Sequence, residues 1–163
     1  MLFIINGKSN GKLKEYYENG ELLFEGEVLN GKRNRKGKEF YENSQLLFEG
    51  EYLNGKRNGK GKEFYSNGKL LFEGEYLNGK RNGKGKEFNE NDEVEFEGEY
   101  LKEKRWNGKG VEYDINGNLE FDGEYLNGKR WNGIFKEYDW ETGELSLEGI
   151  IIEGEKLEYW ILK

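Results

Sequence analysis

The 163-residue sequence contains no cysteine and no histidine. The absence of cysteine excludes a disulfide framework and thiol chemistry. The absence of histidine removes the commonest general base, and without cysteine the best nucleophile at neutral pH is missing as well. Both absences argue against an enzyme.

The sequence also lacks a long hydrophobic run. The apolar segment 1–5 is short, has no basic leader and precedes no small-residue cleavage site, so it does not read as a signal peptide. No other run approaches the ~20 apolar residues of a membrane-spanning helix. We therefore expect a cytoplasmic protein.

Proline is absent too, and the charged residues, which make up 36% of the chain, give a net charge of −7. This acidic balance argues against DNA, RNA or anionic lipid as an obligatory partner. A high charge content with low hydropathy is found in disordered chains. However, aromatic residues form 15% of the sequence and recur periodically, so we expect a folded protein.

What the sequence does contain is one segment repeated along its length. Residues 48–71 read FEGEYLNGKRNGKGKEFYSNGKLL, and residues 24–47 differ from them at five positions. Residues 72–95 begin with the same seventeen residues. A fixed period of roughly 20–50 residues is typical of a repeat array.

Each unit predicts a β-hairpin. Residues 72–77 alternate between an aromatic or glycine and a glutamate, which is typical of a strand with two unlike faces. A second short strand is expected over residues 84–88, and the Asn-Gly pairs between the two strands favour tight turns. The register that we predict places Tyr76 opposite Gly85.

In the same register Glu75 lies opposite Lys86, which pairs opposite charges across the strands.

A single hairpin buries too little apolar surface to be stable alone. Hairpins placed side by side bury their aromatic rows against each other. The sequence therefore predicts an all-β fold of tandem β-hairpin repeats that form one elongated, twisted, mostly antiparallel single-layer sheet.

We interpret residues 1–163 as a single repeat domain. A partial unit at 1–23, in which Asn6-Gly7 begins the turn motif, precedes the full units. The full units cover residues 24–47, 48–71, 72–95, 96–120 and 121–146, and residues 147–163 form a C-terminal cap. We expect this cap to be a final hairpin that ends the sheet or packs over one face.

The pattern Phe/Tyr-x-Gly-x-Tyr-x-x-Gly-x-x-x-Gly-x-Gly, found at residues 72–85, resembles the MORN repeat. The flanking Tyr-x-Asn-Gly-x-Leu at residues 65–70 is similar to the MORN variant of bacterial proteins, some of which are labelled antitoxin-like. The resemblance implies a groove-forming antiparallel sheet that mediates protein contact, self-association or membrane attachment. It implies no catalytic activity, because the enzyme domains to which MORN units are attached elsewhere are missing.

The sequence predicts no catalytic, cofactor or metal site. Glutamates such as Glu73 and Glu75 recur in every repeat, whereas an acid–base pair is unique and has contrasting environments. Residues 79–84 have three residues between their glycines where a phosphate-binding loop has four. Residues 114–120 lack the twelve-residue spacing of a calcium loop. We interpret both as turns.

Aromatic side chains are the first candidates for binding a partner. Trp106 and Trp131 are inserted at equivalent turn positions, where they form either a binding hot spot or, as we favour, a layer packed under the cap with Trp160. The full set of candidates comprises Trp106, Trp131, Trp140, Tyr52, Tyr76, Tyr100 and Tyr125.

The basic turns are the second set of candidates, because a row of cations along one edge attracts anionic head groups or an acidic partner. These candidates are Lys56, Arg57, Lys80, Arg81, Lys129 and Arg130. Turn lysines also keep a sheet edge soluble, and we favour that simpler interpretation.

We therefore predict a non-enzymatic module for protein–protein interaction or scaffolding. It would bind another protein, or a second copy of itself in a homodimer, without cofactor or nucleic acid. One alternative is a peripheral membrane adaptor that binds anionic lipid through the basic turns. Another is an antitoxin-like partner of a toxin.

Overall fold

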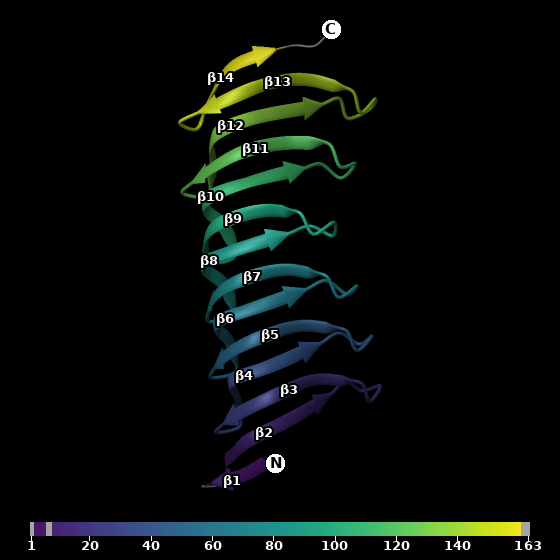
Figure 1. The fold of residues 1–163 in the computed structure, drawn as a ribbon, viewed down its shortest axis with the longest axis vertical. Coiled ribbons are helices and arrows are strands. Elements are labelled where there is room, and N and C mark those ends of the chain that lie inside the picture. The colour runs from purple at the N-terminus through teal and green to yellow at the C-terminus, as the bar shows by residue number, and fades with distance from the viewer. Residues whose placement is uncertain (1, 6–7, 161–163) are drawn as a thin grey trace.

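The computed structural model describes residues 2–5 and 8–160, and the side chains of residues 10–157. Over this part of the chain, fourteen strands form one antiparallel sheet whose strand order follows the sequence (Figure 1). The strands are β1 (Leu2–Ile5), β2 (Lys8–Tyr16), β3 (Leu22–Leu29), β4 (Lys32–Phe40), β5 (Leu46–Leu53), β6 (Lys56–Phe64), β7 (Leu70–Leu77), β8 (Lys80–Phe88), β9 (Val94–Leu101), β10 (Lys104–Tyr113), β11 (Leu119–Leu126), β12 (Lys129–Tyr138), β13 (Leu145–Ile152) and β14 (Glu155–Trp160).

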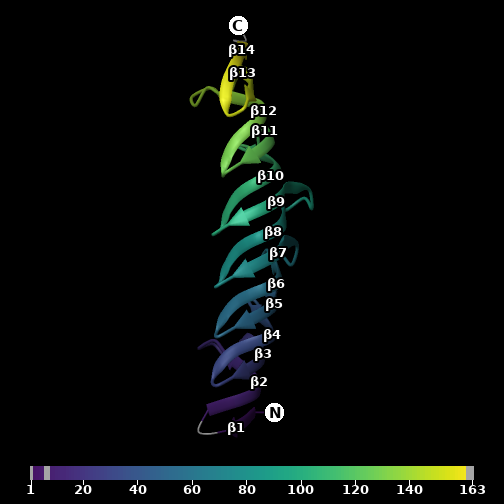
Figure 2. The same cartoon turned by 90° about the vertical axis from the view of Figure 1, so that its left-hand side faces the viewer.

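The sheet is an elongated, twisted column with the two termini at opposite ends (Figures 1 and 2). The predicted all-β, single-layer hairpin sheet is confirmed. The final hairpin, β13–β14, continues the sheet rather than folding back over a face. The turn expected at Asn6-Gly7 lies outside the described residues.

The predicted register within the hairpin is wrong. Leu77 pairs with Lys80 and Tyr76 pairs with Arg81, so the hairpin turn contains only Asn78 and Gly79. Both turn residues have positive φ, 53° and 87°, as a type I′ turn requires. The sequence predicts a longer connection that includes the second Asn-Gly pair, so the turn is shorter than predicted.

The second Asn-Gly pair instead forms a β-bulge inside β8. Gly83 has φ of 99°, which a glycine adopts without steric cost. The Asn82 side-chain oxygen accepts a hydrogen bond from the backbone N–H of Lys102 in the next turn, 3.3 Å away. Asn58 does the same for Asn78. The bulge therefore links successive turns along one edge of the sheet, which we call the short-turn edge.

The aromatic residues form a continuous stack along one face of the sheet, the aromatic face. Phe48 is fully buried, and its ring meets Tyr52 of its own strand at 5.6 Å and Tyr76 of the next hairpin at 5.2 Å, both edge to face. The same alternation continues from Phe24 to Tyr125. Contacts between neighbouring hairpins therefore build the core, as expected for a repeat array.

Bare glycines make room for these rings. Gly50 and Gly61 pair across β5 and β6, and the Phe48 ring lies directly over both. A Cβ atom placed on Gly61 would lie 2.5 Å from Cζ of Phe48 and 3.2 Å from Cε2 of Tyr76. Tyr76 thus covers a glycine of the preceding unit, not Gly85 as predicted.

The last full unit modifies this arrangement. Phe135 occupies the position of the strand glycine and pairs with Phe121 on one side and Gly149 on the other. Ile151 takes the place that tyrosine has in the other units, and both Phe135 and Ile151 are buried. The core of this unit is therefore built from a phenylalanine and an isoleucine where the other units use a tyrosine over a glycine.

Substituting Gly61 with alanine tests the ring–glycine contact. The added methyl group overlaps Phe48 and backbone motion must relieve the clash, so we expect a loss of about 1–3 kcal/mol in unfolding free energy. Lys60→Ala, which changes the exposed neighbour on the other face, should alter stability by less than ~0.5 kcal/mol. Urea denaturation followed by circular dichroism measures both. Equal stability of the two variants would contradict the assigned packing.

Candidate partner-binding groove

An open groove crosses the face opposite the aromatic rings, which we call the groove face. It has a volume of about 1210 Å³ and extends from β2 to β8. Its floor is the backbone at the paired glycines, and its two sides are charged. The loop-side row consists of Lys14, Glu25, Lys38, Glu49, Lys62 and Glu73, and the turn-side row of Lys12, Glu27, Lys36, Glu51, Lys60, Glu75 and Lys84.

The charges form stripes because even-numbered strands contribute the lysines and odd-numbered strands the glutamates. Residues of one strand that are two apart share a face, so Lys60 and Lys62 flank Gly61 on β6. On β7, Glu73 and Glu75 flank Gly74 in the same way. The stripes alternate in sign along the whole groove, and each occupies about 4.8 Å.

The tyrosines named as candidates for binding a partner lie on the other face. Tyr52, Tyr76, Tyr100 and Tyr125 are buried in the aromatic stack. Burial and a nearby glutamate raise the pKa of Tyr52, and its hydroxyl donates a hydrogen bond to Glu39. These tyrosines hold the sheet together, and the groove itself is polar.

The predicted cationic arginines are built into a ladder on the aromatic face. The Arg81 guanidinium stacks over Phe72 at 4.3 Å and forms ion pairs with Glu63 at 2.5 Å and Glu87 at 2.9 Å. Arg33, Arg57 and Arg81 each join a glutamate of the preceding unit to one of their own unit, and Arg105 ends the chain at Glu87. The members of the chain are Glu15, Arg33, Glu39, Arg57, Glu63, Arg81, Glu87 and Arg105.

The ladder is interrupted where a tryptophan is inserted. Trp106 is the extra residue of a bulge in β10, and it shifts the pairing so that Gly98 lies opposite Gly108. Arg105 consequently donates to the carbonyl of Val111 instead of pairing with Glu112 of its own strand, and it lies 3.5 Å from Glu95 on β9. A separate ion pair joins Arg130 to Glu112 at 2.5 Å beyond this point.

The tryptophans pack along the short-turn edge. A Cβ on Gly128 would lie 3.2 Å from Trp106, and one on Gly154 would lie 3.4 Å from Trp131. Each ring therefore covers the turn of the next hairpin, and only Trp131 meets the C-terminal hairpin. Trp140 is 88% exposed in the loop before β13. The side chain of Trp160 lies outside the described ones.

The predicted turn lysines differ from the arginines beside them. Lys56, Lys80 and Lys129 are exposed at the beginnings of β6, β8 and β12, whereas the adjacent Arg57, Arg81 and Arg130 are half-buried in ion pairs. Only half of the predicted basic edge is therefore available to an outside anion.

Sequence reasoning missed the turn-side row of the groove. The signal was present, because Lys84 and Lys86 are two residues apart and so share a face, and the same pair recurs in earlier units. The predicted register, however, pairs Lys86 with Glu75, whereas in the structure Lys86 pairs with Glu73. The distinction between the two rows depends on the bulge.

In residues 2–5 and 8–160, no helix is long and apolar enough to cross a membrane. The same part of the chain contains no group of three or more acidic, histidine or cysteine side chains placed to hold a metal ion.

A single-layer sheet of tandem hairpins with one packed face and one grooved face defines a β-hairpin repeat protein. The MORN repeat matches residues 48–69, 72–92 and 96–119, and the MORN repeat variant matches residues 9–30 and 36–54. These matches cover more than half of the chain, which therefore belongs to the MORN-repeat family. No curated protein matches it.

Replacing Arg81 with methionine tests the ladder. The side chains of Arg81 and Glu63 are only 13% and 15% exposed, so the change leaves partly buried carboxylates unpaired. We expect a loss of about 2–4 kcal/mol in unfolding free energy, measured by urea denaturation. The matched control is Arg35→Met, since the Arg35 side chain is 80% exposed and its ion pair with Glu27 should contribute less than ~0.5 kcal/mol. Equal losses would refute a stabilising ladder.

Acid should weaken the ladder. Burial opposes ionisation of Glu87, but Arg105 and Arg81 outweigh it and lower its pKa. The stabilisation is therefore complete above pH about 4.5, the ordinary value, and is lost as the pH falls through the lower folded-state pKa. The raised pKa of Glu95, caused by burial, opposes this trend in part.

Thermal unfolding between pH 7 and 3 measures the effect. Glu87→Gln should melt at a lower temperature than the parent chain at pH 7, and the difference should shrink below pH about 4.5. A difference that stays constant over this range would show that the charge of Glu87 does not stabilise the fold.

Proposed function

We propose that this chain is a non-enzymatic module that binds another protein along the groove face. MORN repeats commonly mediate protein or membrane interactions. The observation that carries the proposal is the open charged groove across β2–β8. The aromatic face is already sealed by its own side chains, so the groove is the surface shaped to receive a partner.

The groove supports a protein partner better than a lipid bilayer. A bilayer presents a broad, nearly flat surface, whereas the cations of this chain are divided between a recessed groove and one narrow edge. Lys56, Lys80 and Lys129 would have to bind lipid without their neighbouring arginines, which are held by glutamates. A protein segment, in contrast, can enter the groove and meet both signs of charge.

Site-specific crosslinking tests the proposal, because a cysteine introduced into this cysteine-free chain is unique. Lys62→Cys places a photoreactive maleimide label in the middle of the groove. Ser66→Cys places the same label on an exposed loop at the opposite edge from the short turns. After illumination in a cell extract, we expect discrete protein adducts of the groove variant that the loop variant does not form.

The masses of the adducts distinguish the partners. An adduct of twice 19.2 kDa that contains only this chain identifies a second copy in the groove. An adduct with a different protein, identified by mass spectrometry, identifies an outside partner. Identical adduct patterns for the two labels, or none from the groove, would contradict protein binding at this face.

A further inference from the structure

The turn-side row of the groove contains lysines without ionic partners. Lys12, Lys36, Lys60 and Lys84 are exposed, and among the described residues no carboxylate lies within 4.0 Å of their ammonium groups. The loop-side row differs, because Lys38 and Lys62 pair with glutamates at 3.4 Å and 3.3 Å. Both rows alternate lysine with glutamate, so the difference in pairing comes from their position on the strands.

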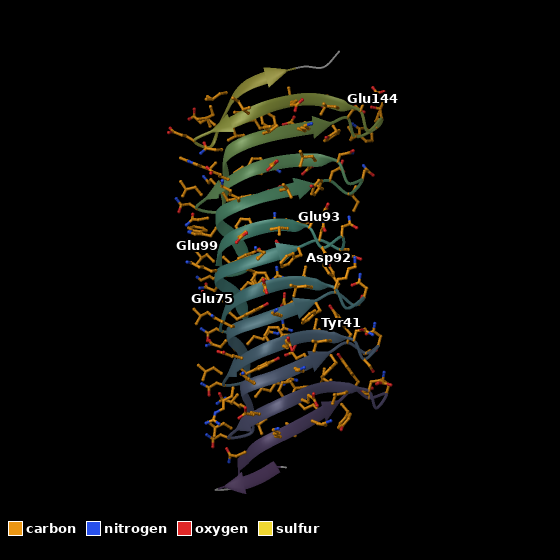
Figure 3. The ribbon with its side chains drawn as sticks, viewed as in Figure 1. Tyr41, Glu75, Asp92, Glu93, Glu99 and Glu144 are labelled. Atoms are coloured by element: carbon orange, nitrogen blue, oxygen red, sulfur yellow. The ribbon has the colours of Figure 1, made fainter. Side chains whose placement is uncertain are left out.

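The β-bulge explains why the turn-side lysines are unpaired. The Glu75 carboxylate accepts a hydrogen bond from the backbone N–H of Lys84 at 3.0 Å and lies against Gly83. Glu51 lies against Gly59 in the same manner. Figure 3 shows Glu75 and Glu99 toward the short-turn edge. The bulge residues thus hold these carboxylates away from the lysines: the backbone N–H of Lys84 donates to Glu75, and the side-chain amide of Asn107 donates to Glu99 at 2.8 Å.

The unpaired lysines coincide with the extent of the groove. Both begin at β2 and end at β8. In the next two hairpins the equivalent positions are Lys109, which pairs with Glu124 at 3.8 Å, and Ile134, which carries no charge. Strands of the same fold that lie outside the groove therefore lack unpaired lysines at this position. The free cations are a feature of the groove and not of every repeat.

The spacing of the lysines limits what can pair with them. They occur on every second strand, so they are about 9.6 Å apart along the groove. Seven residues of an α-helix rise ~10.5 Å and three residues of polyproline II rise ~9.3 Å, and each returns a side chain to nearly the same side. Three residues of a β-strand cover a similar length but place the side chains on opposite sides.

We infer that the groove receives an acidic protein segment whose carboxylates recur about every 10 Å on one side and pair with Lys12, Lys36, Lys60 and Lys84. This inference rests on the proposed function and specifies the chemistry of its partner. The charge of the lysines supplies the attraction, and their regular spacing supplies the selectivity. A segment of equal charge with clustered carboxylates reaches fewer of the lysines at once.

Two pairs of synthetic peptides test the inference. The first pair consists of alanine-rich helices with glutamate at every seventh position or with the same glutamates clustered at one end. The second pair consists of Pro-Pro-Glu repeats and a peptide of the same composition with clustered glutamates. Fluorescence anisotropy with the full chain at low and high salt measures each affinity.

We expect at least one spaced peptide to bind at least tenfold more tightly than its clustered partner, and this binding to weaken with salt. The double variant Lys36→Glu/Lys60→Glu should lose the binding by a further factor of ten or more. The control Lys104→Glu/Lys129→Glu makes the same change in charge at exposed positions outside the groove, and should retain at least a third of the affinity. Thermal unfolding checks that both variants remain folded.

Equal binding of spaced and clustered peptides, or equal losses in the two double variants, would overturn the inference. Cosedimentation with phosphatidylserine vesicles that requires Lys36 and Lys60 would also overturn it, because a lipid surface then suffices. If the groove crosslinks to a protein but no spaced peptide is preferred, this inference fails while the proposed function stands.

Discussion

The contact of a phenylalanine ring with two glycines of its own hairpin is the constraint on which the rest of the structure depends. The ring of Phe48 lies over Gly50 and Gly61, where a single Cβ would approach within 2.6 Å. This contact buries the ring completely in a sheet only one layer thick. It also brings the ring into edge-to-face contact with Tyr76 of the next hairpin. The phenylalanine that packs within one hairpin therefore also joins that hairpin to the following one.

The aromatic face is closed by its own side chains, which leaves the groove face as the open charged surface. Arg57 stacks over Phe48 at 4.1 Å and is held by Glu39 and Glu63, so the outer surface of the stack is occupied by internal ion pairs. Cations in this ladder stabilise the fold and are not available for an external anion. The opposite face has no aromatic stack, and along the groove its loop-side lysines are ion-paired whereas its turn-side lysines have no ion pair among the described residues. The stabilising contacts and the proposed binding surface therefore lie on different faces of one sheet.

The inserted tryptophans mark where the regular pattern changes. Trp106 adds a residue to β10, moves the pairing with β9 and separates Arg105 from the glutamate that would continue the ladder. The regular part of the ladder and the charged groove both lie on the N-terminal side of this change. Local sequence irregularity thus divides the sheet into two parts although the aromatic stack continues through both.

The sequence by itself determined the hairpin repeat, the single-layer sheet and the alternation of an aromatic face with a charged one, because these follow from local periodicity. It did not determine the register, since two Asn-Gly pairs offered two possible turns. Only the tertiary structure decided that Asn78-Gly79 turns the chain and that Gly83 lies in a bulge. That choice moves Glu75 onto the bulge backbone and leaves Lys60 and Lys84 unpaired. Cross-strand neighbours, which the order of residues alone does not specify, therefore decide which charges remain free.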